Sequence, residues 1–208
     1  MPSGKQKQQG NPSQAPSARD WVIEGLRTLA GSGIEGVKVE RLAAAMGISK
    51  GPFYWRFVNR AEMLDAMLAL WRKEFTAHLI EQSASLASPR ARMETLLDNV
   101  LAATWRGTDV ARVEGAIRAW AAQDPVAGSV VREVDRMRVS YLVHELGLIG
   151  LDASKAETMA KGIYLALLGL YATRQYTPEL ADDAALRALV GLWLDQAEAW
   201  ARPAKSRS

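Results

Sequence analysis

Three absences narrow what this chain of 208 residues can be. It contains no cysteine, which excludes a disulfide scaffold and any zinc or iron–sulfur site with cysteine ligands. Its only histidines are His78 and His144, too few for a metal site built from histidine alone. No apolar run approaches the roughly 20 residues of a membrane span, and the polar N-terminus lacks the apolar core of a secretory signal. We therefore expect a cytoplasmic protein without a metal or cofactor.

Charge is distributed unevenly along the chain. The whole chain has a net charge of +3, but residues 1–60 hold nine Lys/Arg against four Asp/Glu, a net of +5. The remainder carries a net of −2. A basic segment beside a near-neutral body is typical of a protein whose N-terminal part faces nucleic acid. A solvated surface with an incidental bias would give the same counts.

Apolar residues recur at helical spacing along the chain, so the sequence predicts an all-α protein of about nine helices. Residues 1–16 are rich in Gln, Pro and Ser and are predicted to form a disordered tail. No alternating pattern typical of a β-strand is found. Cap and breaker residues place the helices at Ser17 to about Gly31, 39–46, 50–56, Asn59 to about 85, Pro89 to near Gly107, 110–122, Asp124 to about 146, Asp152 or Ser154 to 175, and 179–201.

Residues 38–60 (KVERLAAAMGISKGPFYWRFVNR) have the pattern of a helix-turn-helix. Gly47 stands at the turn, because glycine has no Cβ to clash in a left-handed residue. Ala43 is small and allows the second helix to approach closely. The buried wedge would consist of Leu42, Met46, Ile48, Phe53 and Phe57. The exposed face, short enough to enter a major groove, would consist of Ser49, Lys50, Gly51, Tyr54, Trp55 and Arg56.

This segment resembles the DNA-binding domain of the TetR/AcrR family of transcriptional regulators. The family pattern is Ala-x-x-x-Gly-Val/Ile-Ser, then a short helix ending Tyr-x-x-Phe, then Lys at the start of the fourth helix. The chain matches it with AAAMGIS at 43–49 and YWRF at 54–57, and carries Arg60 in place of the Lys. It departs from the family at Lys38 and Val39, where a capping Thr or Ser is common. The resemblance covers about residues 18–70 and implies a helix-turn-helix domain over 17–60 and a helical ligand-binding and dimerisation domain over 61–208.

The resemblance also implies roles for individual residues of the DNA-binding domain. Phosphate contacts are expected from Ser49, Lys50, Tyr54 and Arg60, with Ser49 also capping the recognition helix. Contacts with base edges are expected from Gly51, Pro52 and Trp55. Phosphate contacts set affinity and register, whereas base contacts set sequence preference. In the alternative interpretation, Tyr54 and Trp55 are packing residues.

The helical body carries weaker signals. Aromatic groups on otherwise apolar helices suggest a ligand site, for which the predicted residues are Trp105, Trp120 and Tyr164. A packed core is the alternative. Small and apolar stripes on the last two helices suggest a dimer interface, for which the predicted residues are Gly162, Ala166, Gly169, Leu186, Leu189, Val190 and Trp193. An ordinary helix pair within one chain is the alternative.

These patterns lead to one expected function. The chain would be a ligand-responsive repressor that binds a palindromic operator in double-stranded DNA as a homodimer and is released by a small-molecule effector. An all-helical enzyme is the weaker alternative, since no HExxH, Gly-x-Ser-x-Gly or P-loop motif is found. The other alternative is a protein–protein adaptor whose basic N-terminal helices do not read DNA.

Overall fold

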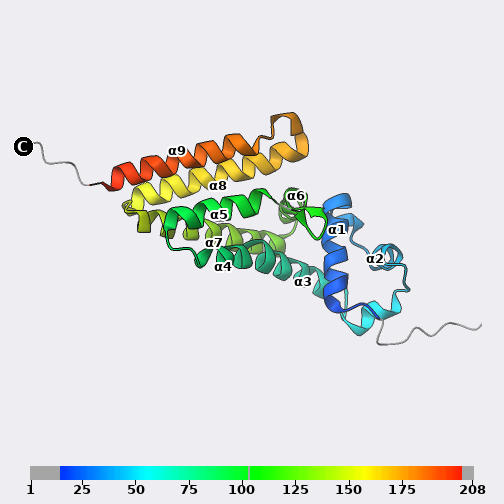
Figure 1. Ribbon diagram of the computed structural model, residues 1–208. Helices are drawn as coiled ribbons and strands as arrows, with labels where there is room; N and C mark the ends of the chain where they lie inside the picture. The colour runs from blue at the N-terminus through cyan, green and yellow to red at the C-terminus, as the bar shows by residue number, and fades with distance from the viewer. Residues whose placement is uncertain (1–14, 103, 203–208) are drawn as a thin grey trace, which may run out of the picture.

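The computed structural model describes residues 15–102 and 104–202. Figure 1 shows a small N-terminal group of helices beside a longer bundle that contains the C-terminal helices. The predicted all-α fold is confirmed. Within the described residues, no helix combines the length and apolarity needed to cross a membrane. The predicted disordered tail covers 1–16, of which 1–14 lie outside the described residues.

The N-terminal group consists of α1 (Ala18–Gly36), α2 (Val39–Ala45) and the 3-10 helix η2 (Gly51–Trp55). Ser17 caps α1 as predicted, because its side chain accepts from the Asp20 amide while the Asp20 carboxylate accepts from the Ser17 amide. The expected end of α1 near Gly31 was too early. The backbone leaves helical geometry at Gly33, with φ of 66°, but one more turn follows as far as Gly36.

The long helix predicted from Asn59 to about 85 is present in three parts. These are α3 (Arg60–Arg72), the π-helical segment η3 (Lys73–Ala77) and α4 (His78–Ala84). The Asn59 side chain accepts from the Glu62 amide at 3.0 Å, which confirms the predicted cap. The π-helical turn was not predicted. Such turns are rare and often occur at functional sites.

The body contains α5 (Pro89–Leu101), α6 (Val110–Ala121), α7 (Pro125–Ile149), α8 (Ala153–Tyr176), the short η4 (Pro178–Leu180) and α9 (Asp183–Ala201). The Asp124-Pro125 start of α7 is confirmed, and of the two predicted starts of α8 the cap is Asp152. The end of α7 was predicted at Gly147, which proved wrong. The residue with positive φ is Gly150, at 116°, and Gly147 stays inside the helix.

A short hairpin was missed. Strands β1 (Thr104–Trp105) and β2 (Thr108–Asp109) pair antiparallel, and Figure 1 shows the segment that joins α5 to α6 lying beside α1. Its two turn residues, Arg106 and Gly107, have positive φ of 49° and 78°. Positive φ at both central residues is the mark of the tight turn that suits a hairpin. Strands of two residues are too short to show an alternating pattern, which explains the omission.

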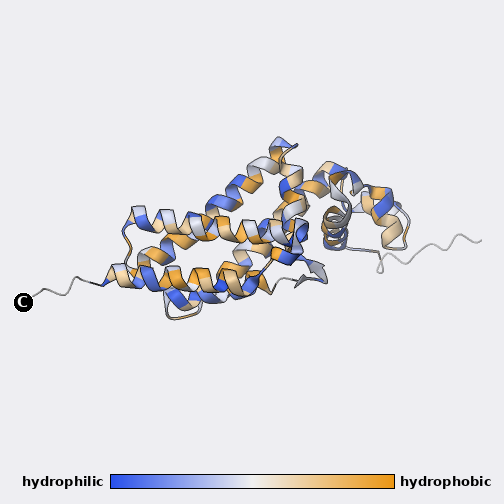
Figure 2. Ribbon diagram, turned by 90° about the horizontal axis from the view of Figure 1, so that it is seen from above, coloured by the Kyte–Doolittle hydropathy of each residue, from blue (hydrophilic) through white to orange (hydrophobic). Residues whose placement is uncertain are grey.

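Two hydrophobic cores hold the molecule together. The first joins α1, α2, η2 and α3 to α6 and the beginning of α7, and includes Trp21, Trp71 and Ile117. The second lies among α5, α7, α8 and α9. Figure 2 shows hydrophobic and hydrophilic residues alternating around the helices, as amphipathic helices require. Because the first core continues past residue 60, the division into domains at that residue stays a prediction about function.

Candidate functional site

The helix-turn-helix is built around a buried aromatic wedge. Gly47 has φ of 68°, and the amide of Ile48 donates to the Ala43 carbonyl at 2.9 Å to close the turn. Phe53 is fully buried and meets the ring of Trp21 edge-on, with centroids 5.2 Å apart. Phe57 is also buried. The predicted wedge is therefore present, and it fixes how η2 leaves the domain.

The outer side of η2 is exposed. Tyr54 and Trp55 are 56% and 65% exposed, among the most exposed large side chains of the described residues. Tyr54 rests edge-on against Phe53, with centroids 5.2 Å apart, so its position is defined although its outer edge is free. Exposed neighbours on the same segment are Ser49, Lys50, Gly51 and Arg56, while Pro52 is half-buried. We therefore assign Tyr54 and Trp55 to the surface and not to the core.

The recognition helix differs from the prediction in type and in capping. It is a 3-10 helix over Gly51–Trp55, where a helix over 50–56 was expected. Its N-cap residue is Lys50, whose carbonyl accepts from the Phe53 amide at 3.1 Å, and no side chain caps it. The predicted cap by Ser49 is therefore wrong, because the helix starts one residue too late for that hydroxyl to serve.

Lys50 lies next to an acid in the free protein. Its Nζ is 3.2 Å from Oε1 of Glu40, and both side chains are exposed. The backbone amide of Glu40 and then Lys50 hold the pKa of that carboxyl below its usual value. Because exposed pairs contribute little stability, Lys50 can exchange this carboxylate for another anion at small cost.

Arg60 has partners inside the domain. Its Nε donates to the Val37 carbonyl at 2.6 Å, and its Nη2 donates to the Ile34 carbonyl at 2.9 Å. These bonds join the start of α3 to the end of α1. Arg60 is thus a structural clamp, and its predicted contact with a DNA phosphate stays a prediction.

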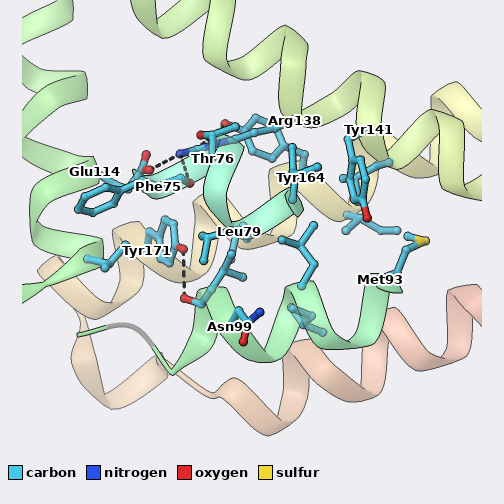
Figure 3. A pocket seen from close by; sticks show the side chains of 18 of the residues that line it. Phe75, Thr76, Leu79, Met93, Asn99, Glu114, Arg138, Tyr141, Tyr164 and Tyr171 are labelled. Atoms are coloured by element: carbon cyan, nitrogen blue, oxygen red, sulfur yellow. Dashed lines mark hydrogen bonds and ion pairs between the residues drawn. The ribbon is translucent and has the colours of Figure 1, made fainter. Parts of the chain in front are cut away.

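The body contains a cavity of about 180 Å³ that is partly open to the surface. Figure 3 shows the side chains that line it, which come from the η3–α4 segment and from α5, α6, α7 and α8. Residues of α9 complete the wall. Most of the lining is apolar, including Leu79, Met93, Leu97, Leu142, Ile163 and Leu167. Polar groups also reach it, including Thr76, Asn99, Glu114, Arg138, Tyr164 and Tyr171.

Two of the three predicted ligand residues lie at this cavity. Trp105 and Tyr164 belong to its lining. Trp120 is instead buried in the first core, where its Nε1 donates to an Asp124 carboxylate oxygen at 3.1 Å. The cavity therefore gives no support to a ligand contact by Trp120, and its packing role is the alternative left open by the sequence.

The sequence did not point to the ion pair beside the cavity. Oε1 of Glu114 accepts from Nη2 of Arg138 at 2.6 Å and from Nε1 of Trp71 at 3.0 Å. Arg138 also donates from Nε to the Thr76 hydroxyl at 2.9 Å. Burial alone would lower the pKa of Arg138, but the charge and hydrogen bond of Glu114 raise it. Glu114, Arg138 and Thr76 come from α6, α7 and η3, which are brought together only by the tertiary structure. No local sequence motif therefore predicts the Glu114–Arg138 pair.

A second polar group supports Tyr164. Its hydroxyl donates to Oδ1 of Asp135 at 2.6 Å and accepts from Nη2 of Arg118 at 2.9 Å. Burial raises the pKa of Tyr164 to about 12, so the phenol keeps its proton at neutral pH. Burial would also raise the pKa of Asp135, but hydrogen bonds from Arg118 and Tyr164 hold it below its ordinary value.

The cavity wall touches the helix that supports the helix-turn-helix. Oε2 of Glu74 accepts from Nε1 of Trp105 at 2.5 Å, while Oε1 forms an ion pair with Arg19 on the first turn of α1. At the middle of α1, Nη2 of Arg27 donates to the Arg106 carbonyl in the hairpin at 2.9 Å. Glu74 and Trp105 both line the cavity. One set of contacts thus joins the cavity to α1.

Several residues predicted for a dimer interface pack within the chain. A Cβ at Gly162 would lie 3.1 Å from the ring of Trp193, so that glycine makes room for the indole. Leu186 and Val190 are buried and line the cavity. For these four residues the intrachain alternative describes the structure. Ala166 is half-buried, and Gly169 and Leu189 are exposed.

The outer face of α8 and α9 nevertheless carries exposed apolar residues. Leu165 on α8 and Leu192 on α9 are 66% and 65% exposed. Gly169 has open space where a Cβ would stand. Figure 1 shows α8 and α9 side by side along one edge of the bundle. The sequence-based choice of helices therefore agrees with an apolar outer face, although several of the chosen residues point inward.

Comparisons with known proteins agree with this fold. Residues 24–67 match the family model of bacterial regulatory proteins of the tetR family. No curated protein sequence matches the chain significantly. A transcriptional regulator from Rhodococcus sp. Rha1 superposes with a TM-score of 0.72 at 20% identity, covering 91% of this chain and 100% of that one.

Two further solved structures are similar. A protein from Saccharomonospora viridis, described as a transcriptional regulator and solved with choline, gives a TM-score of 0.71 at 15% identity, covering 86% of this chain and 95% of that one. A TetR-family member from Streptomyces coelicolor A3 gives 0.64 at 19% identity, covering 88% and 98%. Identities this low show a shared fold. Together with the family match over residues 24–67, they show that the chain shares the fold of solved transcriptional regulators and carries a helix-turn-helix similar to that of the tetR family.

Proposed function

We propose that this chain is a repressor that binds a palindromic operator as a homodimer and leaves it when a small molecule enters the body. The observation that carries the proposal is the exposed aromatic face of η2, where Tyr54 and Trp55 stand outside a fully buried Phe53. A side chain held by a rigid core and left open to solvent is suited to contact a partner. Among the described residues, neither ring is buried by packing within the chain, so a role in the core does not account for them.

The residues of this face would divide the work of DNA binding. Ser49, Lys50 and the Tyr54 hydroxyl would contact phosphates, which carry affinity but no sequence information. Gly51, Pro52 and Trp55 would lie against base edges in the major groove, where apolar contact can recognise a thymine methyl. Arg60 would add a phosphate contact from α3 through Nη1, because its two bonds within the domain use Nε and Nη2.

The homodimer would form through α8 and α9. Leu165, Leu189 and Leu192 are exposed apolar residues on these helices, and contact with a second copy would remove them from water. Gly169 would allow the partner helix to approach closely. Two copies joined there would place two recognition helices about one DNA turn, or 34–36 Å, apart.

Release by a ligand would use the contacts between the cavity and α1. A molecule that packs against Trp105 would change the bond between its indole and Glu74, and through Glu74 the ion pair with Arg19. The choline complex of the Saccharomonospora viridis neighbour supports the idea that this fold can hold a small molecule. DNA affinity would fall only by the ligand's differential affinity for the two states.

DNA selected from a random duplex pool provides the test of the reading face. We expect Tyr54→Ala to weaken binding to all sequences, while Trp55→Ala changes which sequences are preferred by about 1–3 kcal/mol per affected position. Tyr54→Phe isolates the hydroxyl. Lys155→Ala is the matched control for Lys50→Ala, since both lysines are exposed and paired with an acid.

Fluorescence anisotropy at several salt concentrations measures both effects. Loss of the charged contact in Lys50→Ala should reduce the slope of log affinity against log salt by about 1, whereas loss of the uncharged Tyr54 hydroxyl should lower affinity and leave the slope unchanged. Unchanged affinity, slope and preference in both the Tyr54 and Trp55 variants would show that DNA is read by another surface.

Analytical ultracentrifugation tests the dimer. We expect Leu192→Glu to shift the protein toward monomer, because it places a charge in an apolar interface. Leu148→Glu on α7, which is 54% exposed, is the control and should leave the association unchanged. A wild-type protein that sediments as a monomer at the concentrations used for DNA binding would refute the proposed homodimer.

A further inference from the structure

We propose that the effector of this cavity is an uncharged, mostly hydrocarbon molecule about the size of one aromatic ring, with a hydrogen-bonding group placed beside Asn99. The inference deepens the proposed ligand response and rests on it. Four observations carry it: the volume of the cavity, its apolar wall, the pairing of its charged side chains, and the side-chain amide of Asn99.

The volume sets the size of the molecule. The cavity measures about 180 Å³. An apolar protein cavity of about 150 Å³ is known to stay dry and to bind benzene. This cavity therefore has room for one ring with a short substituent, or for an aliphatic chain of similar volume.

The wall sets the polarity of most of the molecule. Leu97 on α5, Leu142 on α7 and Leu167 on α8 approach from three sides, and Leu79 and Ile163 add further apolar surface. Figure 3 shows these helices surrounding the space. Hydrocarbon groups that leave water for such a wall gain free energy in proportion to the apolar area that they bury.

The pairing of the charged lining residues excludes an ionic ligand. Arg138 is satisfied by Glu114, and Glu74 is shared between Arg19 and the Trp105 indole. Within the described residues, each charged side chain of the lining has a partner of opposite charge. A charged ligand would lose its water without gaining a free counter-ion, or would have to break a buried pair, and both are costly.

One carboxylate oxygen needs separate consideration. Oε2 of Glu114 is buried and, among the described residues, accepts no hydrogen bond. It lies 3.8 Å from Nη2 of Arg118, so a cation already faces it. This oxygen is therefore not a free anionic site for a ligand cation.

The tyrosine hydroxyls at the cavity are already engaged. Tyr141 bonds with Ser83 at 3.0 Å, Tyr164 with Asp135 at 2.6 Å, and Tyr171 donates to the Val100 carbonyl at 3.2 Å. Asn99 differs, because no described residue forms a hydrogen bond with its side-chain amide. Figure 3 shows it on the α5 wall. An amide offers both a donor and an acceptor, and so matches an alcohol, a carbonyl or an amide on the ligand.

Three probes of nearly the same shape and different charge test the inference: benzyl alcohol, benzylamine and benzoate. Binding to the full chain is measured by isothermal titration calorimetry at neutral pH, where the last two are ionised. We expect benzyl alcohol to bind and each charged probe to bind at least about tenfold more weakly, because burying an unpaired charge is unfavourable. Equal or tighter binding of either charged probe, or no binding of benzyl alcohol up to its solubility limit, would overturn the inference.

Variants locate the bound probe. Leu97→Phe reduces the volume of the cavity and should abolish binding, whereas Leu148→Phe adds the same group at an exposed position and should not. Leu167→Phe replaces the first variant if circular dichroism shows that it is unfolded. Asn99→Leu should weaken benzyl alcohol several-fold and leave toluene unchanged. Undiminished binding of benzyl alcohol in the filled cavity, or in Asn99→Leu, would contradict the assigned site.

DNA binding in the same samples separates this inference from the proposed function. If benzyl alcohol binds as expected and DNA affinity is unchanged, the effector chemistry stands and the ligand response is in question. If a charged molecule binds in the cavity and releases DNA, the ligand response stands and the inference of an uncharged effector is wrong.

Discussion

The two ends of the molecule use their aromatic and charged residues in opposite ways. Around η2, the interior is filled by rings such as Phe53, while Tyr54 and Trp55 stand in solvent. In the body, polar and charged groups such as Glu114 and Arg138 lie inside, next to an open cavity. The helix-turn-helix has a filled core and exposed aromatic side chains, which is suited to rigid contact with a large partner. The body has a cavity beside paired charges, which is suited to binding a small molecule.

The largest expected effect comes from breaking the buried pair of the body. Arg138→Met leaves the Glu114 carboxylate buried without its main partner and should cost about 3–5 kcal/mol of unfolding free energy. Urea denaturation measures this loss. The double variant Arg138→Met/Glu114→Leu should recover part of it, because two apolar groups need no partner, while the buried Nε1 of Trp71 loses its acceptor.

A comparable loss in the N-terminal group should not be recoverable in this way. Phe53→Ala removes a fully buried ring and should cost about 3–5 kcal/mol through the cavity that it leaves. If the double variant of the body is as unstable as Arg138→Met alone, then the loss in the body does not come from an unpaired buried charge. The proposed difference between the two ends of the molecule would then be wrong.

A smaller effect is expected at alkaline pH. The pKa of Tyr164 is raised to about 12 by burial, against about 10 for a free tyrosine. The folded protein therefore holds this proton more tightly than the unfolded chain does. The stability that this provides is complete below pH 10 and is lost as the pH rises through 12.

Thermal unfolding between pH 9 and pH 12 measures this dependence. Tyr164→Phe should flatten it, whereas Tyr176→Phe, at a residue 74% exposed, should not. If Tyr164→Phe lost stability at alkaline pH more steeply than the wild type, the alkaline loss could not be assigned to ionisation of the Tyr164 hydroxyl.

The smallest effect on stability is expected where the two ends meet. Arg19 pairs with Glu74 at the surface, and its side chain is 52% exposed, so Arg19→Ala should change the unfolding free energy by less than about 1 kcal/mol. The same variant should nevertheless reduce the effect of a bound ligand on DNA affinity. Arg72→Ala, which removes the exposed pair with Glu133, is the control. Equal ligand responses in wild type and Arg19→Ala would show that the ends communicate by another route.

The sequence predicted the N-terminal end more completely than the body. The turn at Gly47 and the spacing that buries Phe53 and Phe57 while exposing Tyr54 involve residues close in the chain, and local spacing reports such patterns directly, although Phe53 packs on the distant Trp21. The Ser49 cap failed because a shift of one residue in the helix start changes which residue holds the N-cap position. Patterns of spacing do not define helix ends that finely.

In the body, local patterns identified helices but not what lies between them. Sequence patterns gave no reason to prefer one of the aromatic residues Trp105, Trp120 and Tyr164 as a ligand contact. Of the three, only Trp105 and Tyr164 line the cavity. Leu186 and Val190 fitted an interface stripe and turned out to face the interior. The direction of a helix face depends on which neighbours pack against it, and those neighbours are far away in sequence.

The amino-acid sequence by itself determined the order of the main helices, the caps by Ser17, Asn59 and Asp124, and the helix-turn-helix, because these depend on backbone preferences and on side chains three or four residues apart. Tertiary structure alone decided the cavity, the Glu114–Arg138 pair and the contact of Glu74 with both Trp105 and Arg19. Each of these joins residues more than 20 positions apart, and such contacts arise only when the hydrophobic faces of several helices are buried together.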